Sequence, residues 1–255
     1  MNHVRLIHNA THITQGDLTH AELLQLYAYP AADHPWVRVN FVTSIDGQIT
    51  VDGTSGGLGT PADKTVFSVL RELPDVVVVG AGTVRAENYG GVHYDDGVKA
   101  RRFAGGQAPT PPIAVVSAHA NLDPTSRLFT DTEVAPLVIT SNRADPDKVA
   151  ALTAAGARIA VAGDTTVTTA GLLEILADHQ FHRVLCEGGP TLVGQLASDS
   201  AVDDVCLTTS PHLVAGESRT FTGGAPGTTM AMSPAHILVD DDGTILTRWV
   251  RVADE

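Results

Sequence analysis

A glutamate, two glycines and a proline, Glu187-Gly188-Gly189-Pro190, follow an apolar run at residues 184–186. Proline is favoured at the first position of a helix because its φ angle is already helical and its missing N–H would have no partner there. The pattern therefore predicts a buried strand, a glycine turn and a helix that begins with free backbone amides. Such amides bind an anionic phosphate, and glycines let that phosphate approach the backbone closely. Without a ligand, the same residues would form only a tight corner between strand and helix.

A second glycine turn, Gly-Ala-Gly-Thr at residues 80–83, follows four valines at residues 76–79. A strand that is apolar at four successive positions is typical of a sheet covered on both faces. Ligands of open α/β sheets collect at the carboxyl ends of the strands, where both turns and Glu187 are expected to lie. The two turns together predict one anionic ligand that lies across this edge of the sheet.

Alternating strand and helix patterns position these turns. The alternation predicts an α/β fold with a mainly parallel, twisted sheet and helices on both faces. The predicted strands are residues 36–42, 75–79, 113–117, 137–141, 159–162, 184–186 and 205–209. The predicted helices are residues 19–27, 145–155 and 169–179, one that starts at Thr60-Pro61 and one that starts at Pro190. Two final strands, 237–239 and 245–250, flank residues 240–244 and predict a C-terminal antiparallel hairpin.

Two glycine-containing segments are expected to lie between these elements. Residues 48–59 are polar and contain glycines at positions 53, 56, 57 and 59, which indicates a mobile loop near a site or a flexible connection. Residues 88–112 are rich in Gly, Asp and Arg and predict a long surface loop. Residues 1–35 are expected to be a leader with one short helix, followed by a single domain at residues 36–255.

Composition narrows the function classes. The 255 residues carry a formal net charge of -13, which argues against nucleic acid and anionic membranes as partners. Residues 1–10 lack the apolar core of a signal peptide, and no apolar run reaches membrane-spanning length, so a cytoplasmic protein is expected. The two cysteines lie in apolar runs, as buried thiols do, and exclude a zinc site built on paired CxxC motifs. No phosphate-binding G-x-x-x-x-G-K-[ST] motif is present, which disfavours a kinase-like phosphate binder.

Several motifs, in their order and spacing, resemble the reductase domain of the bifunctional riboflavin-biosynthesis deaminase-reductase over about residues 36–252. They are Thr43-Ser44-Ile45-Asp46-Gly47, Thr60-Pro61, Leu70-Arg71, Gly80-Ala81-Gly82-Thr83-Val84, Glu187-Gly188-Gly189-Pro190-Thr191-Leu192 and Val202-Asp203-Asp204. The resemblance implies a dihydrofolate-reductase-like three-layer sandwich and a homodimer. It also implies NADPH-dependent reduction of 5-amino-6-(5-phosphoribosylamino)uracil to the ribitylamino product.

The resemblance further implies which residues contact each ligand. The cofactor contacts would be Thr43, Thr60, Gly80, Gly82, Thr83, Glu87, Ser117, Gly188, Gly189, Pro190, Thr191, Leu192 and Val193. The substrate contacts would be Ser44, Asp46, Gly56, Arg71, His93 and Glu187. Asp46 and Glu187 would be the catalytic residues: Glu187 accepts hydrogen bonds from the pyrimidine, and Asp46 orients the amine or relays a proton. Arg71 would pair with a substrate anion.

Four of these residues also have an ordinary structural explanation. Asp46 could be a turn acid, Arg71 a solvated helix residue, Thr83 a helix cap and Ser117 a plain serine at a strand end.

Two departures from the family pattern bear on the substrate. The zinc-deaminase signatures H-x-E and P-C-x-x-C are absent, so only the reductase half is expected. His93 lies near the place where the family has an arginine for the substrate phosphate, with Arg101 and Arg102 as other candidates. Arg85 and Arg143 are both candidates for the 2′-phosphate of NADPH.

Two other functions stay open at this point. One is an NADPH-dependent reductase of dihydrofolate or another pterin, which the shared fold permits. The other is a regulatory protein that binds NADPH without turnover. Oxidation of NADPH with each substrate would separate the three.

Overall fold

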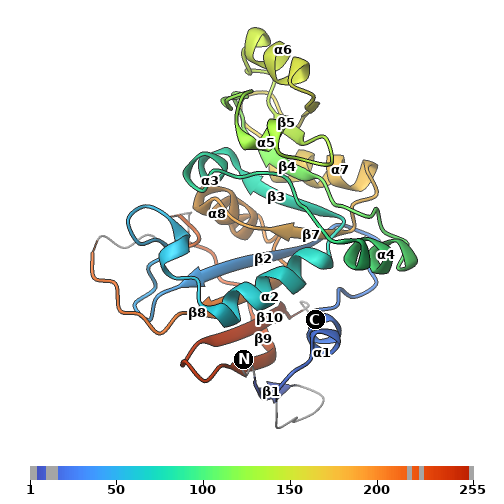
Figure 1. Ribbon diagram of the computed structural model, residues 1–255. Helices are drawn as coiled ribbons and strands as arrows, with labels where there is room; N and C mark the ends of the chain where they lie inside the picture. The colour runs from blue at the N-terminus through green and yellow to red at the C-terminus, as the bar shows by residue number, and fades with distance from the viewer. Residues whose placement is uncertain (1–4, 10–16, 217–219, 224–226, 253–255) are drawn as a thin grey trace.

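The computed structural model describes residues 5–9, 17–216, 220–223 and 227–252. The valines at residues 76–79 form β3 (Val76–Gly80), in which every residue is buried. The other strands are β1 (Arg5–Asn9), β2 (Trp36–Thr43), β4 (Ile113–Val116), β5 (Leu137–Thr140), β6 (Arg158–Val161), β7 (Arg183–Cys186), β8 (Asp204–Thr209), β9 (Met232–Val239) and β10 (Ile245–Arg251). Within the described residues they form one ten-stranded sheet in the order β1-β9-β10-β8-β2-β7-β3-β4-β5-β6 (Figure 1).

Strand direction divides the sheet into two parts. Neighbouring strands from β8 to β6 are parallel, whereas β1, β9, β10 and β8 pair antiparallel. β9 and β10 are the predicted C-terminal hairpin, which is confirmed. The carboxyl ends of β2, β7, β3 and β4 therefore lie at one edge of the sheet, because parallel strands end on the same side.

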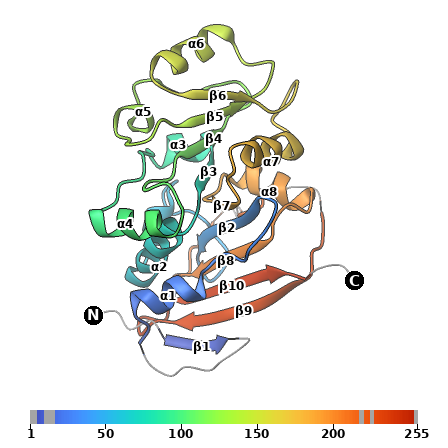
Figure 2. The same ribbon diagram turned by 90° about the vertical axis from the view of Figure 1, so that its right-hand side faces the viewer.

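Helices cover both faces of this sheet. They are α1 (His20–Leu26), α2 (Pro61–Glu72), α3 (Ala81–Ala86), α4 (Asp96–Ala104), α5 (Arg127–Thr130), α6 (Pro146–Ala154), α7 (Thr169–Asp178) and α8 (Pro190–Ser198), with a 3-10 turn η1 (Ser55–Gly57). Figure 2 shows α1, α2 and α4 on one side of the sheet and α7 and α8 on the other. The three-layer α/β sandwich that the resemblance implies is thus confirmed.

The alternation of side chains along β3 explains how one strand serves two cores. Val77 and Val79 pack in a cluster that includes Val66 and Leu70 of α2. Val76 and Val78 point the other way, into a cluster built from α7 and α8. Because successive strand residues face opposite sides, an unbroken apolar run fills both layers.

The prediction of a long loop over residues 88–112 is wrong, because α4 lies within it. The Asp95 side chain accepts a hydrogen bond from the Val98 N–H at 2.8 Å and caps the helix. Val98 is buried, and Arg102 is buried with its guanidinium donating to the carbonyl oxygens of Ala108 and Glu72. Arg102 occupies a buried position where a helix usually has an apolar side chain. The sequence of α4 therefore lacks the apolar periodicity that would predict a helix. The sequence also does not predict β1, which pairs with β9.

Two buried arginines, on β2 and β10, fasten α1 to the sheet. Arg38 and Arg248 both donate to Asp204 Oδ2, at 2.7 and 2.8 Å from their Nη2 atoms. Their Nη1 atoms donate to the carbonyl oxygens of Tyr27 and Leu26, at 2.5 and 2.6 Å. The positive charges therefore lie at the C-terminus of α1, where the helix dipole favours cations.

Histidine 236 in β9 predicts a pH dependence of stability. The side chain is 1% exposed, packs edge-on against Tyr27, and its Nε2 has no partner among the described residues. Burial lowers the pKa of His236 to about 3, and the positive charge of Arg248 acts in the same direction. Below its usual pKa of 6.5, only the unfolded chain binds a proton at this side chain, so acid destabilises the fold.

We therefore expect the free energy of unfolding to fall by up to about 1.4 kcal/mol per pH unit from pH 6.5 toward 4 on account of His236. Urea unfolding at a series of pH values measures this slope. The slope should be shallower in His236→Gln than in the wild type. Equal slopes in the wild type and His236→Gln would contradict the prediction.

Two further expectations concern the thiols and the helices. Cys186 and Cys206 are free and buried, as predicted, and burial raises the pKa of each thiol. Of the helices in the described ranges, none combines the length and the apolar character needed to cross a bilayer.

Candidate active site

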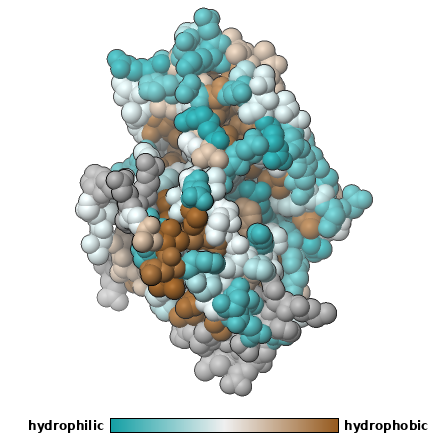
Figure 3. Space-filling model, turned by 60° about the vertical axis from the view of Figure 1, so that its left-hand side comes forward, coloured by the Kyte–Doolittle hydropathy of each residue, from teal (hydrophilic) through white to brown (hydrophobic). Residues whose placement is uncertain are grey.

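A cleft of about 1750 Å³ opens at the carboxyl edge of the parallel strands. Its walls come from the ends of β2, β3, β4 and β7, from α2, from the first turns of α3 and α8, and from the glycine-rich loop at residues 49–59. Figure 3 shows this face of the molecule hollowed, with apolar and polar surface both reaching the hollow. A concave site with mixed walls at this place in an α/β sheet is the usual setting for a small-molecule ligand.

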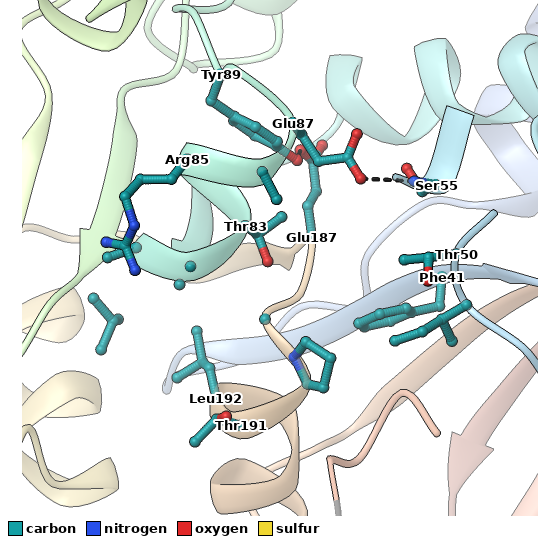
Figure 4. Close-up of a pocket in the computed structure, with 18 of the residues that line it drawn as sticks. Phe41, Thr50, Ser55, Thr83, Arg85, Glu87, Tyr89, Glu187, Thr191 and Leu192 are labelled. Atoms are coloured by element: carbon teal, nitrogen blue, oxygen red, sulfur yellow. Dashed lines mark hydrogen bonds between the residues drawn. The ribbon is translucent and has the colours of Figure 1, made fainter. Parts of the chain in front are cut away.

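The two glycine turns meet at the floor of the cleft. The Gly80 N–H donates to the Gly188 carbonyl oxygen at 2.9 Å, and a Cβ on Gly189 would lie 3.3 Å from the Gly80 Cα. Gly188 and Gly189 have φ angles of +98° and +82°, which glycine adopts without strain. Gly189 caps α8 with no side-chain hydrogen bond, and Thr191 and Leu192 of its first turn line the cleft with Thr83 (Figure 4). Gly223 also packs against this turn, because a Cβ there would lie 3.0 Å from the Thr191 nitrogen.

Because these turns pack closely, we expect an added methyl group to lower stability at Gly188 but not at Gly82. A Cβ at Gly188 would lie 2.6 Å from Phe41 Cζ, at a φ angle that L-residues avoid. Gly188→Ala should therefore destabilise the protein by about 1–3 kcal/mol in urea unfolding. Gly82→Ala is the matched control, because a Cβ there meets nothing within 4 Å and alanine favours the helix. A Gly188→Ala variant as stable as Gly82→Ala would contradict this account.

Glu187 holds an arginine and a tyrosine at the end of β7. Arg71 donates to the carboxylate through Nε at 2.7 Å and Nη2 at 2.6 Å, and the Tyr89 hydroxyl donates to Oε2 at 2.8 Å. The Glu187 side chain is 2% exposed, and the Arg71 guanidinium stacks on the Phe67 ring at 4.5 Å. Figure 4 shows Tyr89 and Glu187 approaching each other from α3's end and β7.

Charge within this group shifts two pKa values. Burial lowers the pKa of Arg71, but the Glu187 carboxylate more than offsets this and raises it above the usual value. Burial and the same carboxylate raise the pKa of Tyr89 well above its usual value. Arg71 therefore stays positive and Tyr89 stays protonated, so Glu187 is ringed by donors on one side.

The glycine-rich loop is tied to α3 by Glu87. The Ser55 N–H donates to Glu87 Oε1 at 2.7 Å, an interaction drawn in Figure 4. Gly56 lies next to this contact and lines the cleft. The contact therefore holds the loop over the side of the cleft that faces α2.

Most of the residues predicted for the site line this cleft. They are Gly56, Arg71, Gly80, Gly82, Thr83, Glu87, Ser117, Glu187, Gly189, Pro190, Thr191 and Leu192. The residues that do not line it are Thr43, Ser44, Asp46, Thr60, His93, Gly188 and Val193. Gly188 and Val193 belong to the same turn and helix as the lining residues.

Asp46 makes structural contacts in a turn. Its Oδ1 accepts from the Ser44 hydroxyl at 2.5 Å and from the Val214 N–H at 3.0 Å, and the carboxylate is exposed. These hydrogen bonds, the Ser44 one first, lower the pKa of Asp46. In this conformation Asp46 joins the end of β2 to the segment after β8, and it lies outside the cleft lining.

Three other predicted residues with hydroxyl groups also have protein partners. Thr60 caps α2 and accepts a hydrogen bond from the Thr244 hydroxyl at 2.9 Å. Thr43 is buried beside the Thr208 carbonyl. Ser117 lines the cleft while its hydroxyl accepts from the Asn121 N–H at 3.0 Å.

The candidates for a substrate phosphate lie apart from the cleft lining. His93 is half exposed and faces Asp131 at 3.0 Å and Glu133 at 3.6 Å. Arg101 pairs with Glu72, and the buried Arg102 donates to main-chain carbonyls. Each of these three side chains therefore already has a protein partner.

On α2 the sequence predicted Arg71 but missed the lining residues Asp63, Lys64 and Phe67. Asp63, Phe67 and Arg71 recur every four residues, so one face of the helix presents an acid, a ring and a guanidinium to the cleft. Burial raises the pKa of Asp63. This effect outweighs the hydrogen bond with Thr208 and the charge of Lys64, which both lower the pKa. The four-residue spacing of Asp63, Phe67 and Arg71 could have indicated that they share one face of the helix. No local pattern could have indicated that Tyr89 contacts Glu187.

Comparisons with known proteins identify the family of this chain. The family model described as the RibD C-terminal domain matches residues 35–246. A 2,5-diamino-6-ribosylamino-4(3H)-pyrimidinone 5′-phosphate reductase from Archaeoglobus fulgidus is 30% identical over 71% of this chain and 83% of its own length. The reductase of the same name from Methanothermobacter thermautotrophicus is 32% identical over 74% of this chain and 84% of its own length.

A solved structure extends the likeness to the fold. The crystal structure of a pyrimidine reductase-like protein from Corynebacterium diphtheriae has a TM-score of 0.82 and 28% identity, covering 93% of this chain and 100% of that one. The resemblance drawn from the motifs is confirmed. The chain belongs to the RibD C-terminal domain family.

Proposed function

We propose that this protein is an NADPH-dependent reductase of a phosphoribosylaminopyrimidine in riboflavin biosynthesis. One observation carries the proposal: a single cleft combines an uncapped helix N-terminus between two glycine turns with a buried, donor-ringed carboxylate. The first feature suits a diphosphate, and the second suits a heterocycle with N–H groups. A protein that only bound phosphate would not need the second.

The residues of the cleft fit NADPH. Glycines stand where a Cβ would meet the facing backbone, and Gly82 leaves open space within 4 Å. We propose that the α8 amides at Thr191 and Leu192, with Thr83, hold the diphosphate. Bound NADPH would supply the hydride that converts the ribosyl group to a ribityl chain.

The chain's own residues would position the substrate. Glu187 would accept hydrogen bonds from ring N–H and amino groups, while Arg71 and Tyr89 hold its carboxylate in position. Phe41 and Phe67 line the cleft and would exclude water from the reacting carbon. The role of Asp46 in orienting an amine or relaying a proton stays a prediction.

The names of the relatives favour one substrate. Both archaeal relatives are named for 2,5-diamino-6-ribosylamino-4(3H)-pyrimidinone 5′-phosphate, which carries an amino group at C2. We propose this compound as the substrate, with the corresponding uracil, expected from the motifs, as the second candidate. Glu187 can accept a hydrogen bond from an amino group, which the uracil lacks at that position.

Steady-state oxidation of NADPH at 340 nm tests the function. We expect turnover with the diaminopyrimidinone phosphate and a ribityl product by mass spectrometry, with less or no turnover on the uracil and none on dihydrofolate. Turnover of dihydrofolate alone would favour the pterin alternative. NADPH binding without oxidation of any of the three would indicate the regulatory alternative.

Three broader expectations belong to the same proposal. We propose that residues 36–255 form the reductase domain, that residues 1–35 are a leader whose β1 and α1 pack on the same sheet, and that the protein acts as a cytoplasmic homodimer. Size-exclusion chromatography with light scattering tests the assembly state, because a dimer would have twice the mass of the chain.

A further inference from the structure

The segment that follows α3, residues 88–94, contacts the Arg71–Glu187 pair at two places. The Tyr89 hydroxyl donates to Glu187 Oε2 at 2.8 Å, and the Tyr89 ring faces the Arg71 guanidinium at 5.7 Å (Figure 4). The Tyr94 hydroxyl donates to the Arg71 carbonyl oxygen. Both contacts come from one stretch of chain, so the position of this stretch decides where the Tyr89 hydroxyl lies.

Gly91 docks this segment on the turn that follows α5, residues 131–134. The Gly91 N–H donates to the Asp131 carbonyl oxygen at 2.7 Å, and the Thr132 hydroxyl closes the turn by donating to the Val134 carbonyl oxygen at 2.7 Å. A Cβ on Gly91 would lie 2.6 Å from both the Cα and the Cβ of Thr132. Real Cβ atoms essentially never approach another atom within 3.0 Å. Only glycine therefore lets the segment lie this close to the turn.

The direction of the missing Cβ separates Gly91 from its neighbour Gly90. The three atoms nearest to a Cβ on Gly91 all belong to Thr132, so a methyl group there points at the turn and not into the cleft. A Cβ on Gly90 would instead meet Asp131 Oδ2 at 3.1 Å and Arg127 Nη2 at 3.2 Å, which are the ends of flexible side chains. Neither glycine has a φ angle in the left-handed region, so backbone conformation does not exclude alanine at either position.

A methyl group on Gly91 would reach the site through Tyr89. Ordinary van der Waals contact begins at 3.4 Å, so the added Cβ would push the segment and the turn apart by about 1 Å. Tyr89 is two residues away, and its hydroxyl lies 2.8 Å from Glu187 Oε2. Hydrogen bonds between two oxygen atoms span about 2.5–3.0 Å, so a shift of this size breaks the contact.

We propose that Gly91 is a positioning residue of the reductase, because its contact with Thr132 holds Tyr89 in place. The Tyr89 hydroxyl in turn fixes the Glu187 carboxylate for the heterocycle, and a fixed acceptor loses little conformational freedom on binding. This inference rests on the proposed function and extends it to a turn outside the cleft lining. The turn would act on the substrate only through the segment that it holds.

Steady-state kinetics with the pyrimidine phosphate and calorimetric titration with NADPH test the proposal on the full chain. The variants are Gly91→Ala, Tyr89→Phe and the double variant, with Gly90→Ala as a matched control. We expect Gly91→Ala to raise KM for the pyrimidine about 10-fold, as Tyr89→Phe does, because both remove one hydrogen bond to a charged acceptor. The value of kcat and the affinity for NADPH should stay within about 2-fold, and Gly90→Ala should leave all three quantities within about 2-fold.

The double variant distinguishes positioning from a general structural defect. If Gly91 acts through the Tyr89 hydroxyl, the double variant has the same increase in KM as each single variant, about 10-fold. A defect independent of Tyr89 would multiply the two effects to about 100-fold. Thr132→Ala is a milder second change, which removes the hydrogen bond to Val134 and answers the question if Gly91→Ala does not fold. It should raise KM about 3-fold in the wild type and leave KM unchanged in the Tyr89→Phe background.

The outcomes separate this inference from the function. Wild-type protein that turns over no pyrimidine phosphate overturns both. Wild-type turnover with an unchanged KM in Gly91→Ala and Thr132→Ala overturns the role of Gly91 alone. The same holds for multiplied effects in the double variant, or for a loss of NADPH affinity as large as the increase in KM. Equal increases in KM for Gly91→Ala, Tyr89→Phe and the double variant support the proposal.

Discussion

Glu187→Gln is expected to lower kcat/KM for the pyrimidine substrate by about 100-fold or more, because a charged acceptor is lost from a buried site. The change removes the partner that fixes Arg71 in two hydrogen bonds. It also leaves a guanidinium that is 23% exposed with no carboxylate to neutralise it. Stopped-flow or steady-state kinetics, with NADPH affinity measured separately by calorimetry, will show whether the loss lies on the substrate side.

Tyr89→Phe is the matched control for this prediction. It keeps the ring and removes one hydrogen bond to Glu187 Oε2, so a loss of about 10-fold is expected. Near-ultraviolet circular dichroism should show that both variants fold. If Glu187→Gln kept wild-type kcat/KM, or lost NADPH affinity as strongly as substrate affinity, Glu187 would not be the substrate contact.

Asp204→Asn is expected to destabilise the protein by about 3–5 kcal/mol, the largest stability effect that we predict. Asp204 is fully buried and pairs with both Arg38 and Arg248, which also hold the C-terminus of α1. Its loss raises the excess positive charge of this buried group from one to two. For a chain of this size the melting temperature should fall by about 10 °C.

The pH dependence of this effect has a definite sign. Burial raises the pKa of Asp204, but Arg38 and Arg248 more than offset this and hold it below its usual value. A depressed pKa stabilises the fold above the unfolded value of about 3.9, and this contribution is lost as pH falls through the folded value. The difference between Asp204→Asn and the wild type should therefore be full at pH 7 and shrink only in strong acid.

An exposed ion pair provides the control for Asp204. Asp131→Asn breaks a pair with Arg127 in which both side chains are about half exposed. A change below about 1 kcal/mol is expected, because water screens such pairs. Equal effects of Asp131→Asn and Asp204→Asn in urea unfolding would rule out the buried cluster as a source of stability.

The sequence by itself determined the elements and the family. The four valines of β3, the Thr60-Pro61 helix start and the Gly188-Gly189-Pro190 turn are local patterns, and local backbone preference is enough to read them. The order of the strand and helix patterns indicated a parallel sheet, and the motifs indicated the family. The sequence did not predict α4, because one of its buried residues is Arg102 and arginine is usually exposed to solvent.

The tertiary structure decided which of the predicted residues meet. Arg71 and Glu187 are 116 positions apart, and nothing local directs the arginine toward the carboxylate. In the same way, tertiary contacts turn Asp46 to Val214 and His93 to Asp131, and bring Arg85 and Lys148 to Asn121. The physical reason is that a side chain's partner depends on strand order and helix docking, which sum weak contacts over the whole chain, whereas backbone conformation follows from a few neighbouring residues.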